Sequence, residues 1–442
     1  MASQKIPGIV AEPYAATIDV ARRISLHGFA AGECVTVTAT LRQTDGSTWR
    51  SEVFFNADAD GGIDVSMAAP IGGTYSGVSP MGLVWSMRQT GEAVPPGTPF
   101  DQLAVQTVQL RAAAASGTAD GSFEQHFVAP GVGVRPIREN GMVATLFTPA
   151  DEGPHPLVVM LSGSGGGLME ARSALFAAHG FAALALGYFG APGLPPTISQ
   201  TRLEYFEAAL RWARRTLLPA DGFVAVGGVS RGGELALLLG ATMPDAIDAV
   251  VAYVPSSVTN GVLNAGRPGE DRHASSWSWR GRNLPVLARD NPRANWGLFD
   301  NAPAPKRQTP AFLAALQDAQ AVARSSIAVE RINGPVLLIG GRDDALWPSA
   351  RFSELAEARL LEAKHPYPVV NLCYDDAGHT ITFPYVPTTV LARAHPVSRI
   401  ELAYGGTAEG NARAGAQSWP AVLTFLDEAR QAVRRGVRES AT

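Results

Sequence analysis

The sequence contains few cysteines and lacks both long apolar runs and blocks of like charge. Cys34 and Cys373 are its two cysteines, too far apart in the chain to suggest a disulfide framework or a metal-ligand spacing. It contains no apolar run of about 18 residues, the length that a membrane-spanning helix needs. The first residues also lack the apolar core of a secretory signal. From these absences we expect a cytoplasmic protein that spans no membrane and holds no metal.

The charges are almost balanced, with 36 Lys and Arg against 40 Asp and Glu and a formal net charge of −4. A nucleic-acid-binding domain would carry a basic patch or stripe, and none is evident. A polybasic segment for a membrane surface is also absent. The 442 residues are 46% hydrophobic, which is typical of a globular chain long enough for two domains.

The first part of the chain, residues 1–115, is predicted to be an all-β sandwich. Residues 34–41 alternate between apolar and polar side chains, the period of a half-buried strand. An Asp-Gly turn joins this segment to a returning strand over residues 49–55. Further short strands are expected at 82–87 and 103–110, between clusters of turn-forming residues.

The second part, residues 116–442, is predicted to be an α/β-hydrolase-like domain. Residues 112–121 are small and polar, so we interpret them as a linker. After a hairpin-like segment near 124–148, short apolar strands alternate with helices, which indicates a mostly parallel sheet covered on both faces. An insertion of about 255–334 contains Trp277, Trp279, Trp296 and Phe299. It is either a lid over the strand ends or a packing element. The expected strands are 156–161, 181–186, 224–229, 248–254, 335–339 and 367–373, and the expected helices are 170–179, 203–214 and 416–435.

The most informative stretch is GVSRG at residues 228–232, which fits the nucleophile-elbow pattern G-x-S-x-G between a strand and a helix. Such a turn strains the backbone, and side chains at the two glycine positions would collide with their neighbours. Glycine relieves the collision and leaves the Ser230 hydroxyl exposed. Ser230 is therefore the candidate nucleophile.

A nucleophilic serine needs a base and an acid, which follow it in this fold in the order Ser, Asp, His. Three histidines follow the strand at 335–339. His365 precedes a strand and would lie at the wrong end of the sheet. His379 follows a strand, at the edge where open α/β sheets place active sites. His395 falls beyond that loop, so His379 is the preferred base.

The acid is expected in the loop after residues 335–339, where GRDDALWP offers Asp343 and Asp344. The spacing from the loop glycine and to the following proline favours Asp344, with Asp343 as the alternative. Backbone N–H groups of Arg231 and of Ser164, in the glycine-rich loop 162–168, are the candidate oxyanion donors. That loop lacks Gly-Lys-Ser/Thr, and no acid follows about 20 residues later, so a phosphate cradle is disfavoured.

With these residues identified, the chain resembles the acyl-CoA thioesterase / bile acid-CoA:amino acid N-acyltransferase family. The similarity extends nearly from end to end. Its motifs are IGGTYSG (71–77), PMGLVWS (80–86), GSGGGLMEARS (163–173), GFAALALGYF (180–189), LEYFEAA (203–209), SRGGEL (230–235), GRDDALWPS (341–349), AGHTITFPYVP (377–387) and GGT (405–407).

The resemblance implies a β-sandwich domain followed by an α/β-hydrolase domain whose Ser/Cys–Asp–His triad maps onto Ser230, Asp344 and His379. It implies an acyl-CoA-like or carrier-bound thioester as the substrate and no separate cofactor. The branch that conjugates amino acids carries cysteine as nucleophile. The serine here favours hydrolysis, because water readily attacks an oxygen-ester intermediate.

Three alternatives to a thioesterase stay open at this point. The acyl group could pass from Ser230 to an amine or alcohol, which would make the protein an acyltransferase. It could be a carboxylesterase that prefers oxygen esters, or a binding protein with an inactive triad. Residues 258–330 match the family poorly, so the resemblance does not predict the acyl chain.

Overall fold

The chain forms two units in the computed structural model, which describes residues 6–91, 94, 98 and 100–440. The first unit comprises the chain up to Ala129 together with Thr382–Val390. The second comprises Pro130–Ile381 and the chain from Leu391 onward. The second half of the sequence therefore contributes a short segment to the N-terminal unit.

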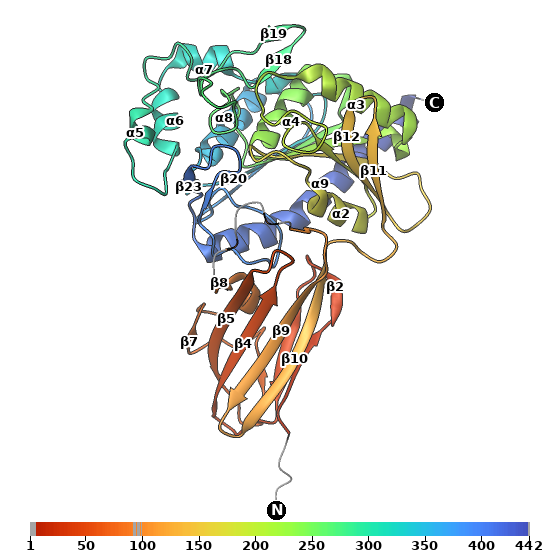
Figure 1. Ribbon diagram of the computed structural model, residues 1–442. Helices are drawn as coiled ribbons and strands as arrows, with labels where there is room; N and C mark the ends of the chain where they lie inside the picture. Colours follow the sequence, from red (N-terminus) through yellow and green to blue (C-terminus); the bar gives the residue numbers. More distant parts are fainter. Residues whose placement is uncertain (1–5, 92–93, 95–97, 99, 441–442) are drawn as a thin grey trace, which may run out of the picture. The chain divides into compact units, whose positions relative to one another are not determined.

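The described residues of the N-terminal unit form two β-sheets and one short helix (Figure 1). One has the order β2-β10-β9-β4-β5-β7, with β8 also paired to β5, and the other has the order β1-β3-β6. Alternate residues of β3, β4 and β5 are buried, as expected for strands with one face on a core. The strands are β1 (Gly8–Glu12), β2 (Ala15–Thr17), β3 (Arg23–His27), β4 (Cys34–Arg42), β5 (Thr48–Asn56), β6 (Ile63–Asp64), β7 (Gly72–Gly73), β8 (Arg88–Thr90), β9 (Gln106–Ala114) and β10 (Gly117–His126).

The linker interpretation of residues 112–121 is wrong, because these residues form the turn and facing ends of the β9–β10 hairpin. β9 lies between β4 and β10, so its backbone groups are paired on both sides. Ala112 and Ala119 bury their methyl groups in the core. The small side chains of this stretch fit a hairpin packed on a core as well as a linker, and the expected boundary at 115/116 falls inside the hairpin.

The predicted strand at 82–87 is also wrong, since residues Gly82–Trp85 form the short helix α1. All four residues are buried, and a short apolar run buried on every side has no period that separates strand from helix. The segment Thr382–Val390 packs beside this helix. The Thr388 N–H donates a hydrogen bond of 3.0 Å to the Trp85 carbonyl, a typical length for a backbone hydrogen bond.

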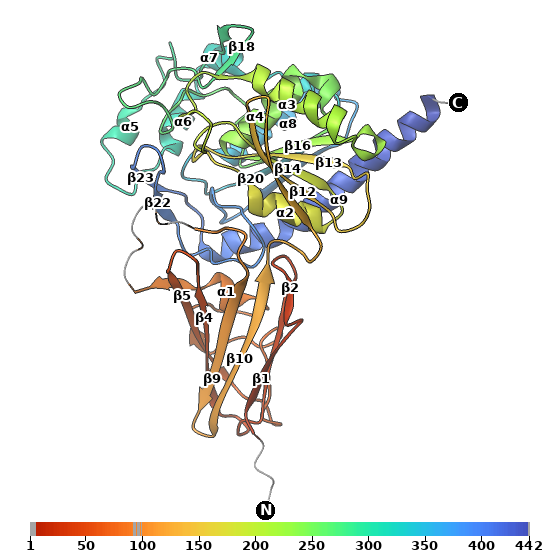
Figure 2. The ribbon, with the colours of Figure 1, turned by 45° about the vertical axis from the view of Figure 1, so that its right-hand side comes forward.

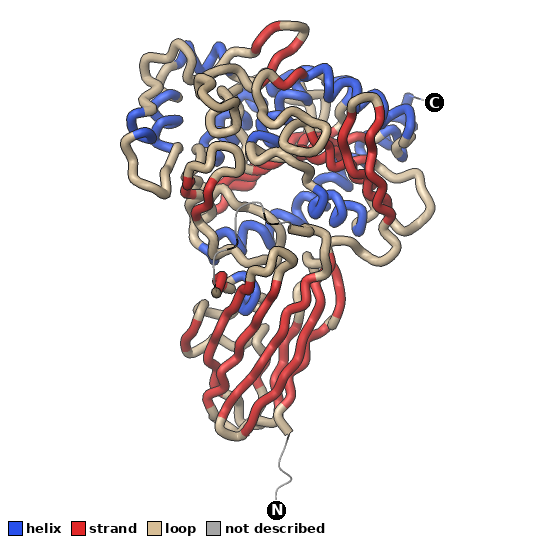
Figure 3. The backbone as a smooth tube through the Cα atoms, viewed as in Figure 1, coloured by secondary structure: helices blue, strands red, loops and turns tan. Residues whose placement is uncertain are grey.

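The second unit is built on a sheet with the order β11-β12-β14-β13-β16-β17-β20-β21 (Figure 3). β11 and β12 pair antiparallel to their neighbours, and the remaining pairs are parallel. β13, β14, β17 and β20 are buried throughout, which explains their continuous apolar sequences. The strands are β11 (Gly133–Glu139), β12 (Met142–Thr148), β13 (Leu157–Leu161), β14 (Ala182–Gly187), β16 (Val224–Val229), β17 (Ala249–Tyr253), β20 (Val336–Gly341) and β21 (Val369–Tyr374).

Helices cover both faces of this sheet (Figures 1 and 2). α3, α4 and α8 lie on one face, and α2 and α9 lie on the other. The predicted α/β-hydrolase fold is therefore confirmed for this unit, although α9 begins earlier than expected. The helices are α2 (Glu170–Ala178), α3 (Leu203–Thr216), α4 (Arg231–Thr242), α8 (Ser349–Glu362) and α9 (Ala408–Ser440), with 3-10 turns η1 (Ala220–Gly222) and η2 (Pro244–Ala246).

The strand order reverses at β13, where the candidate site begins. The chain leaves β13 for β14 on one side and later returns to β16 on the other. The loop after β13 and the loop after β16 therefore diverge from adjacent strands, which opens a crevice at their carboxyl ends. These two loops carry Ser164 and Ser230.

The insertion lies between β17 and β20 and packs around an aromatic cluster. Trp296, Phe299 and Phe312 are buried there with Trp347 and Phe352, so Trp296 and Phe299, both singled out in the sequence, serve at least as packing residues. The insertion contains β18 (Trp277–Trp279), β19 (Arg282–Asn283), α5 (Gly297–Asp300), α6 (Thr309–Ala315), α7 (Ala319–Ser325) and η3 (Val329–Arg331), and β18 pairs with β15 (Thr201–Arg202).

Nowhere among the described residues does a helix combine the length and the apolar character needed to cross a membrane.

Two adjacent leucines of α8 test how this helix packs. Leu360 is fully buried in the core, whereas Leu361 is 65% exposed. We expect Leu360→Ala to lower the free energy of unfolding by about 2–5 kcal/mol, because it leaves a cavity. The matched Leu361→Ala should change it by less than about 0.5 kcal/mol. Urea unfolding followed by circular dichroism measures both, and equal losses would contradict this packing.

Candidate active site

Ser230 occupies a strained turn between β16 and α4. Its backbone has φ 59° and ψ −116°, a region that residues other than glycine rarely adopt. A Cβ on Gly228 would collide with the Gly232 carbonyl, and one on Gly232 would collide with the Leu161 carbonyl. Both glycines are thus required by close backbone approach, as the sequence pattern predicts.

The structure brings Ser230, His379 and Asp344 into one hydrogen-bonded chain. His379 Nε2 lies 2.8 Å from Ser230 Oγ, and His379 Nδ1 lies 2.8 Å from Asp344 Oδ2. Because the carboxylate can only accept, we assign the hydrogen of the neutral imidazole to Nδ1. The Nε2 lone pair then faces the serine hydroxyl, in position to accept its proton.

Asp344 is held by its surroundings as well as by His379. It is 3% exposed, and its Oδ1 accepts hydrogen bonds from the backbone N–H groups of Leu346 at 2.9 Å and Trp347 at 3.2 Å. These bonds satisfy the oxygen that does not contact the histidine. The carboxylate is therefore fixed with its other oxygen directed at the imidazole.

Asp343, the alternative acid, points elsewhere. Its Oδ1 accepts from Arg307 at 3.1 Å and its Oδ2 accepts from the Gly406 N–H at 3.0 Å. About half of the Asp343 side chain is exposed. It is an ordinary surface carboxylate, whereas Asp344 contacts the histidine.

His379 lies between two aromatic rings. Trp347 packs edge-on against the imidazole with a centroid distance of 5.7 Å, and Tyr404 stacks on it at 6.4 Å. The His379 N–H also donates to the Tyr404 carbonyl at 2.8 Å. By contrast, His365 bonds through Nε2 to the carbonyl of Gly334, just before β20, which places it at the amino end of the sheet as predicted.

The glycine-rich loop after β13 lies against Ser230. A Cβ on Gly163 would come 3.3 Å from Ser230 Cβ. Ser164 directly follows Gly163 in the sequence. Arg231 is the first residue of α4, and a helix offers no internal acceptor to the N–H groups of its first turn. Both predicted oxyanion donors thus belong to segments that adjoin Ser230.

The Arg231 side chain turns into the protein rather than into solvent. It is 1% exposed, pairs with Glu234 at 2.9 Å and donates to the Gly261 carbonyl. Its guanidinium carbon also lies 5.6 Å from the centre of the Trp347 ring. A buried cation next to Ser230 is thereby neutralised by a partner in the next helical turn.

Glu234 links this helix to the insertion. It accepts hydrogen bonds from the Asn260 N–H at 3.1 Å, from Asn260 Nδ2 at 3.0 Å and from Trp277 Nε1 at 2.7 Å. Glu234 and Trp277 are both fully buried. The insertion therefore contacts α4, the helix that begins directly after Ser230, through a satisfied polar network.

His395 is a second histidine at the site, although its position in the sequence predicts that it falls beyond the loop of His379. Its Nε2 lies 3.0 Å from Ser164 Oγ, and its Nδ1 accepts from the N–H groups of Val397 at 3.2 Å and Ser398 at 3.4 Å. Burial, with a smaller contribution from Arg231, lowers the pKa of His395 to about 4. No sequence spacing links it to the elbow, because it reaches the loop only through tertiary folding.

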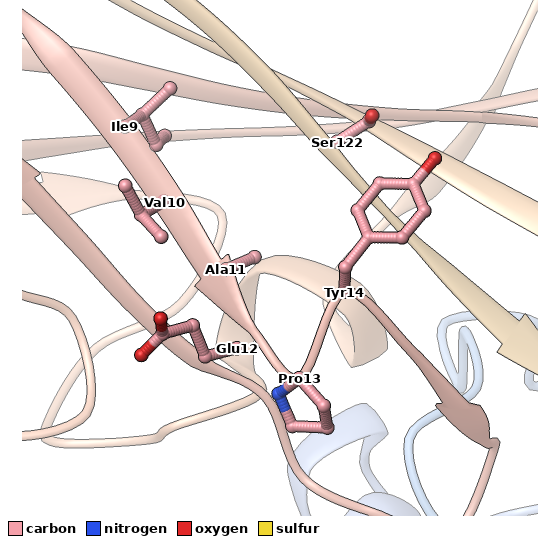
Figure 4. Close-up of a pocket in the computed structure, with 7 residues that line it drawn as sticks. All are labelled: Ile9, Val10, Ala11, Glu12, Pro13, Tyr14 and Ser122. Carbon is pink, nitrogen blue, oxygen red and sulfur yellow. The ribbon is translucent and has the colours of Figure 1, made fainter.

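The N-terminal unit carries a surface hollow lined by residues 9–14 and Ser122 (Figure 4). The Tyr14 and Glu12 side chains point to opposite sides of the view, so these polar groups do not converge on one point. The lining of the hollow therefore offers no hydrogen-bonded serine and histidine like Ser230 and His379. Within the described part of the chain, no cluster of three or more candidate metal ligands is found.

Comparison with known proteins relates the chain to enzymes that act on CoA thioesters. The family model described as BAAT / Acyl-CoA thioester hydrolase C terminal matches residues 201–432. A second model, Acyl-CoA thioester hydrolase/BAAT N-terminal region, matches residues 19–139. The two models thus match parts of both units.

Individual relatives are similar along nearly their whole length. Acyl-coenzyme A thioesterase 6 of Mus musculus is 32% identical over 424 residues, which cover 92% of this chain and 92% of that protein. Acyl-coenzyme A thioesterase 1 of Rattus norvegicus is 30% identical over 418 residues, covering 91% and 92%. Peroxisomal succinyl-coenzyme A thioesterase of Mus musculus is 30% identical over 420 residues, covering 91% and 92%.

The buried His395 makes stability depend on pH in a defined window. Above pH 6.5 the side chain is neutral in both folded and unfolded chains. As the pH falls from 6.5 to about 4, the unfolded chain binds a proton that the folded chain excludes, so unfolding is favoured. Relative to His395→Gln, the wild type should lose on the order of 3 kcal/mol across this window.

Urea unfolding of both proteins at several pH values between 7 and 4 measures this difference. Other titrating groups are common to the two proteins and cancel in the comparison. Parallel stability curves would contradict a buried, neutral His395.

Proposed function

Because the chain belongs to the acyl-CoA thioester hydrolase/BAAT family, we propose that it hydrolyses acyl-CoA thioesters with Ser230 as nucleophile, His379 as base and Asp344 as acid. The observation that carries this proposal is the hydrogen-bonded chain from Ser230 Oγ through the imidazole to the Asp344 carboxylate. Substrates with the acyl group on a carrier protein present the same thioester to these residues.

The first half of the reaction transfers the acyl group to the enzyme. Ser230 Oγ attacks the thioester carbonyl carbon while its proton passes to His379 Nε2. Asp344 accepts the Nδ1–H bond and stabilises the imidazolium that forms. The tetrahedral intermediate then expels the CoA sulfur, which takes the proton from His379, and an acyl ester of Ser230 remains.

Negative charge develops on the carbonyl oxygen during this step. We assign its stabilisation to the backbone N–H of Arg231 and to that of Ser164. The first lies at the amino end of α4, where the helix dipole also favours negative charge. Each such donor is typically worth about 3 kcal/mol of the barrier.

The second half of the reaction releases the acid. Water attacks the acyl carbon, His379 accepts the proton of that water, and the bond to Ser230 Oγ breaks. Ser230 regains its proton from the imidazole, and the free carboxylic acid leaves. An oxygen ester suits this step because water attacks it readily, which supports hydrolysis over transfer for a serine nucleophile.

The insertion is the proposed lid and acyl-binding element. It follows β17, and its residue Trp277 is bonded to Glu234 four positions after the nucleophile. A cytoplasmic location is part of the same proposal, supported by Cys34 and Cys373, which are both free thiols as expected for a reducing compartment.

The direct test follows thiol release from acyl-CoAs of varied chain length, with Ser230→Ala as the comparison. We expect turnover by the wild type and a loss of at least about 10⁴-fold in the variant, because no other group replaces the nucleophile. Full turnover by Ser230→Ala would overturn the proposed mechanism.

If no acyl-CoA releases thiol, intact mass spectrometry separates the remaining activities. An acyl adduct on Ser230 would identify an acyltransferase that awaits its acceptor. Hydrolysis of oxygen esters alone, with no such adduct, would identify a carboxylesterase.

A matched pair of variants tests the choice of acid. Asp344→Asn should lower kcat by about 10³- to 10⁴-fold, because an amide cannot hold the imidazole in the required tautomer. Asp343→Asn removes only an exposed pair and should change kcat by less than about threefold. Steady-state kinetics on one acyl-CoA measures both, and the reverse order would make Asp343 the acid.

A further inference from the structure

We propose that the Ser164 hydroxyl donates a hydrogen bond to the oxyanion, and that His395 is the positioning residue that directs it there. This inference rests on the proposed function and adds a side-chain donor to the two backbone donors assigned above. It starts from the 3.0 Å contact between His395 Nε2 and Ser164 Oγ, which the acyl-transfer steps do not use.

The hydrogen bonds around His395 determine which of its nitrogens carries the hydrogen. Nδ1 faces the backbone N–H groups of Val397 and Ser398, which can only donate, so Nδ1 must be the acceptor. In the neutral ring the hydrogen then belongs to Nε2. His395 therefore donates to Ser164 Oγ, and the serine oxygen is the acceptor in this contact.

This arrangement leaves the hydrogen of the Ser164 hydroxyl available. An oxygen that accepts from His395 can rotate its own O–H toward a further acceptor. Among the described residues, no hydrogen bond from the Ser164 hydroxyl to another acceptor is found. Ser164 adjoins Gly163, which lies against Ser230, so a substrate oxygen beside the nucleophile would supply an acceptor.

Burial keeps His395 in the required form. The side chain is 4% exposed, and its neutral state persists to about pH 4 because burial opposes protonation. A protonated ring would lose the acceptor at Nδ1 and repel the nearby Arg231 cation. His395 is thus suited to hold a hydrogen bond in place rather than to exchange protons with substrate.

The segment around His395 is itself braced. The His395 N–H donates to the Ile400 carbonyl at 2.8 Å, and the Arg399 N–H donates to the His395 carbonyl at 2.9 Å. These bonds close the turn between β22 (Ala392–Ala394) and β23 (Glu401–Ala403), which pair antiparallel. The turn also contacts the glycine-rich loop 162–168 directly, since a Cβ on Gly165 would lie 3.4 Å from Pro396.

Removing the hydroxyl should affect the transition state more than the bound substrate. We expect Ser164→Ala to lower kcat by about 10- to 100-fold with little change in KM, because the oxyanion forms only as the reaction proceeds. Ser164→Thr keeps the hydroxyl and should retain most of kcat. Unchanged kcat in Ser164→Ala would overturn the proposal.

The role of His395 is tested by a double-mutant cycle with an acyl-CoA substrate. His395→Leu should lower kcat about as much as Ser164→Ala, and His395→Gln should recover much of the loss because its amide N–H can replace Nε2–H. If His395 acts through Ser164, adding His395→Leu to Ser164→Ala should cost less than about twofold more. If His395 had only a structural role, the fold losses of kcat in the two single variants would multiply in the double variant.

Two further proteins keep the outcomes distinct. His365→Leu removes a histidine at the opposite end of the sheet and should leave kcat unchanged. Ser230→Ala reports on the proposed function itself. If Ser230→Ala is inactive while Ser164→Ala is fully active, this inference alone fails. If Ser230→Ala is fully active, the proposed function fails with it. Should His395→Leu not fold, Ser164→Ala, Ser164→Thr and His395→Gln still decide the matter.

Discussion

The close approach of backbone segments at the nucleophile elbow is the constraint on which the rest of the site depends. Gly228 and Gly232 admit no Cβ, because the carbonyls of Gly232 and Leu161 occupy that space. The strained Ser230 between them is held by two backbone bonds of 2.9 Å, from its N–H to the Tyr253 carbonyl and from the Glu234 N–H to its carbonyl. The neighbouring strands β13 and β17 thus fix the serine, and strain of this kind persists only where surrounding structure determines it.

The buried ion pair of Arg231 and Glu234 extends this constraint into the insertion. Breaking a buried pair by removing one partner typically costs about 3–5 kcal/mol, because the remaining charge is left uncompensated. Here Glu234 also accepts from Asn260 and Trp277, so a movement of the insertion would expose or unpair that charge. The same network therefore holds both α4 and the base of the insertion in place, whichever acyl group enters.

The sequence predicts the features that follow from local backbone rules. It does not predict the features that depend on contacts between distant parts of the chain. Glycine spacing predicts the elbow around Ser230, and apolar runs predict the strands that precede Asp344 and His379. The structure brings these three residues together. Residues 112–121 are a hairpin rather than a linker because pairing on both sides outweighs their composition. The place of residues 382–390 in the N-terminal unit and the contact of His395 with Ser164 have no signature in sequence spacing.

The two histidines of the site show how one side chain acquires opposite properties from its partners. At His379 the Nδ1 position faces the Asp344 carboxylate, so the hydrogen is on Nδ1 and the lone pair at Nε2 can take a proton from Ser230. At His395 the Nδ1 position faces backbone N–H groups, so the hydrogen is on Nε2 and that nitrogen can only donate. The first arrangement suits a base, and the second suits a fixed hydrogen-bond donor. Because both rings bond to a serine hydroxyl through Nε2, the partner at Nδ1 of each ring sets the difference between the two serines. In the proposed mechanism, Ser230 gives up its hydrogen, whereas Ser164 keeps its own and offers it to a developing negative charge.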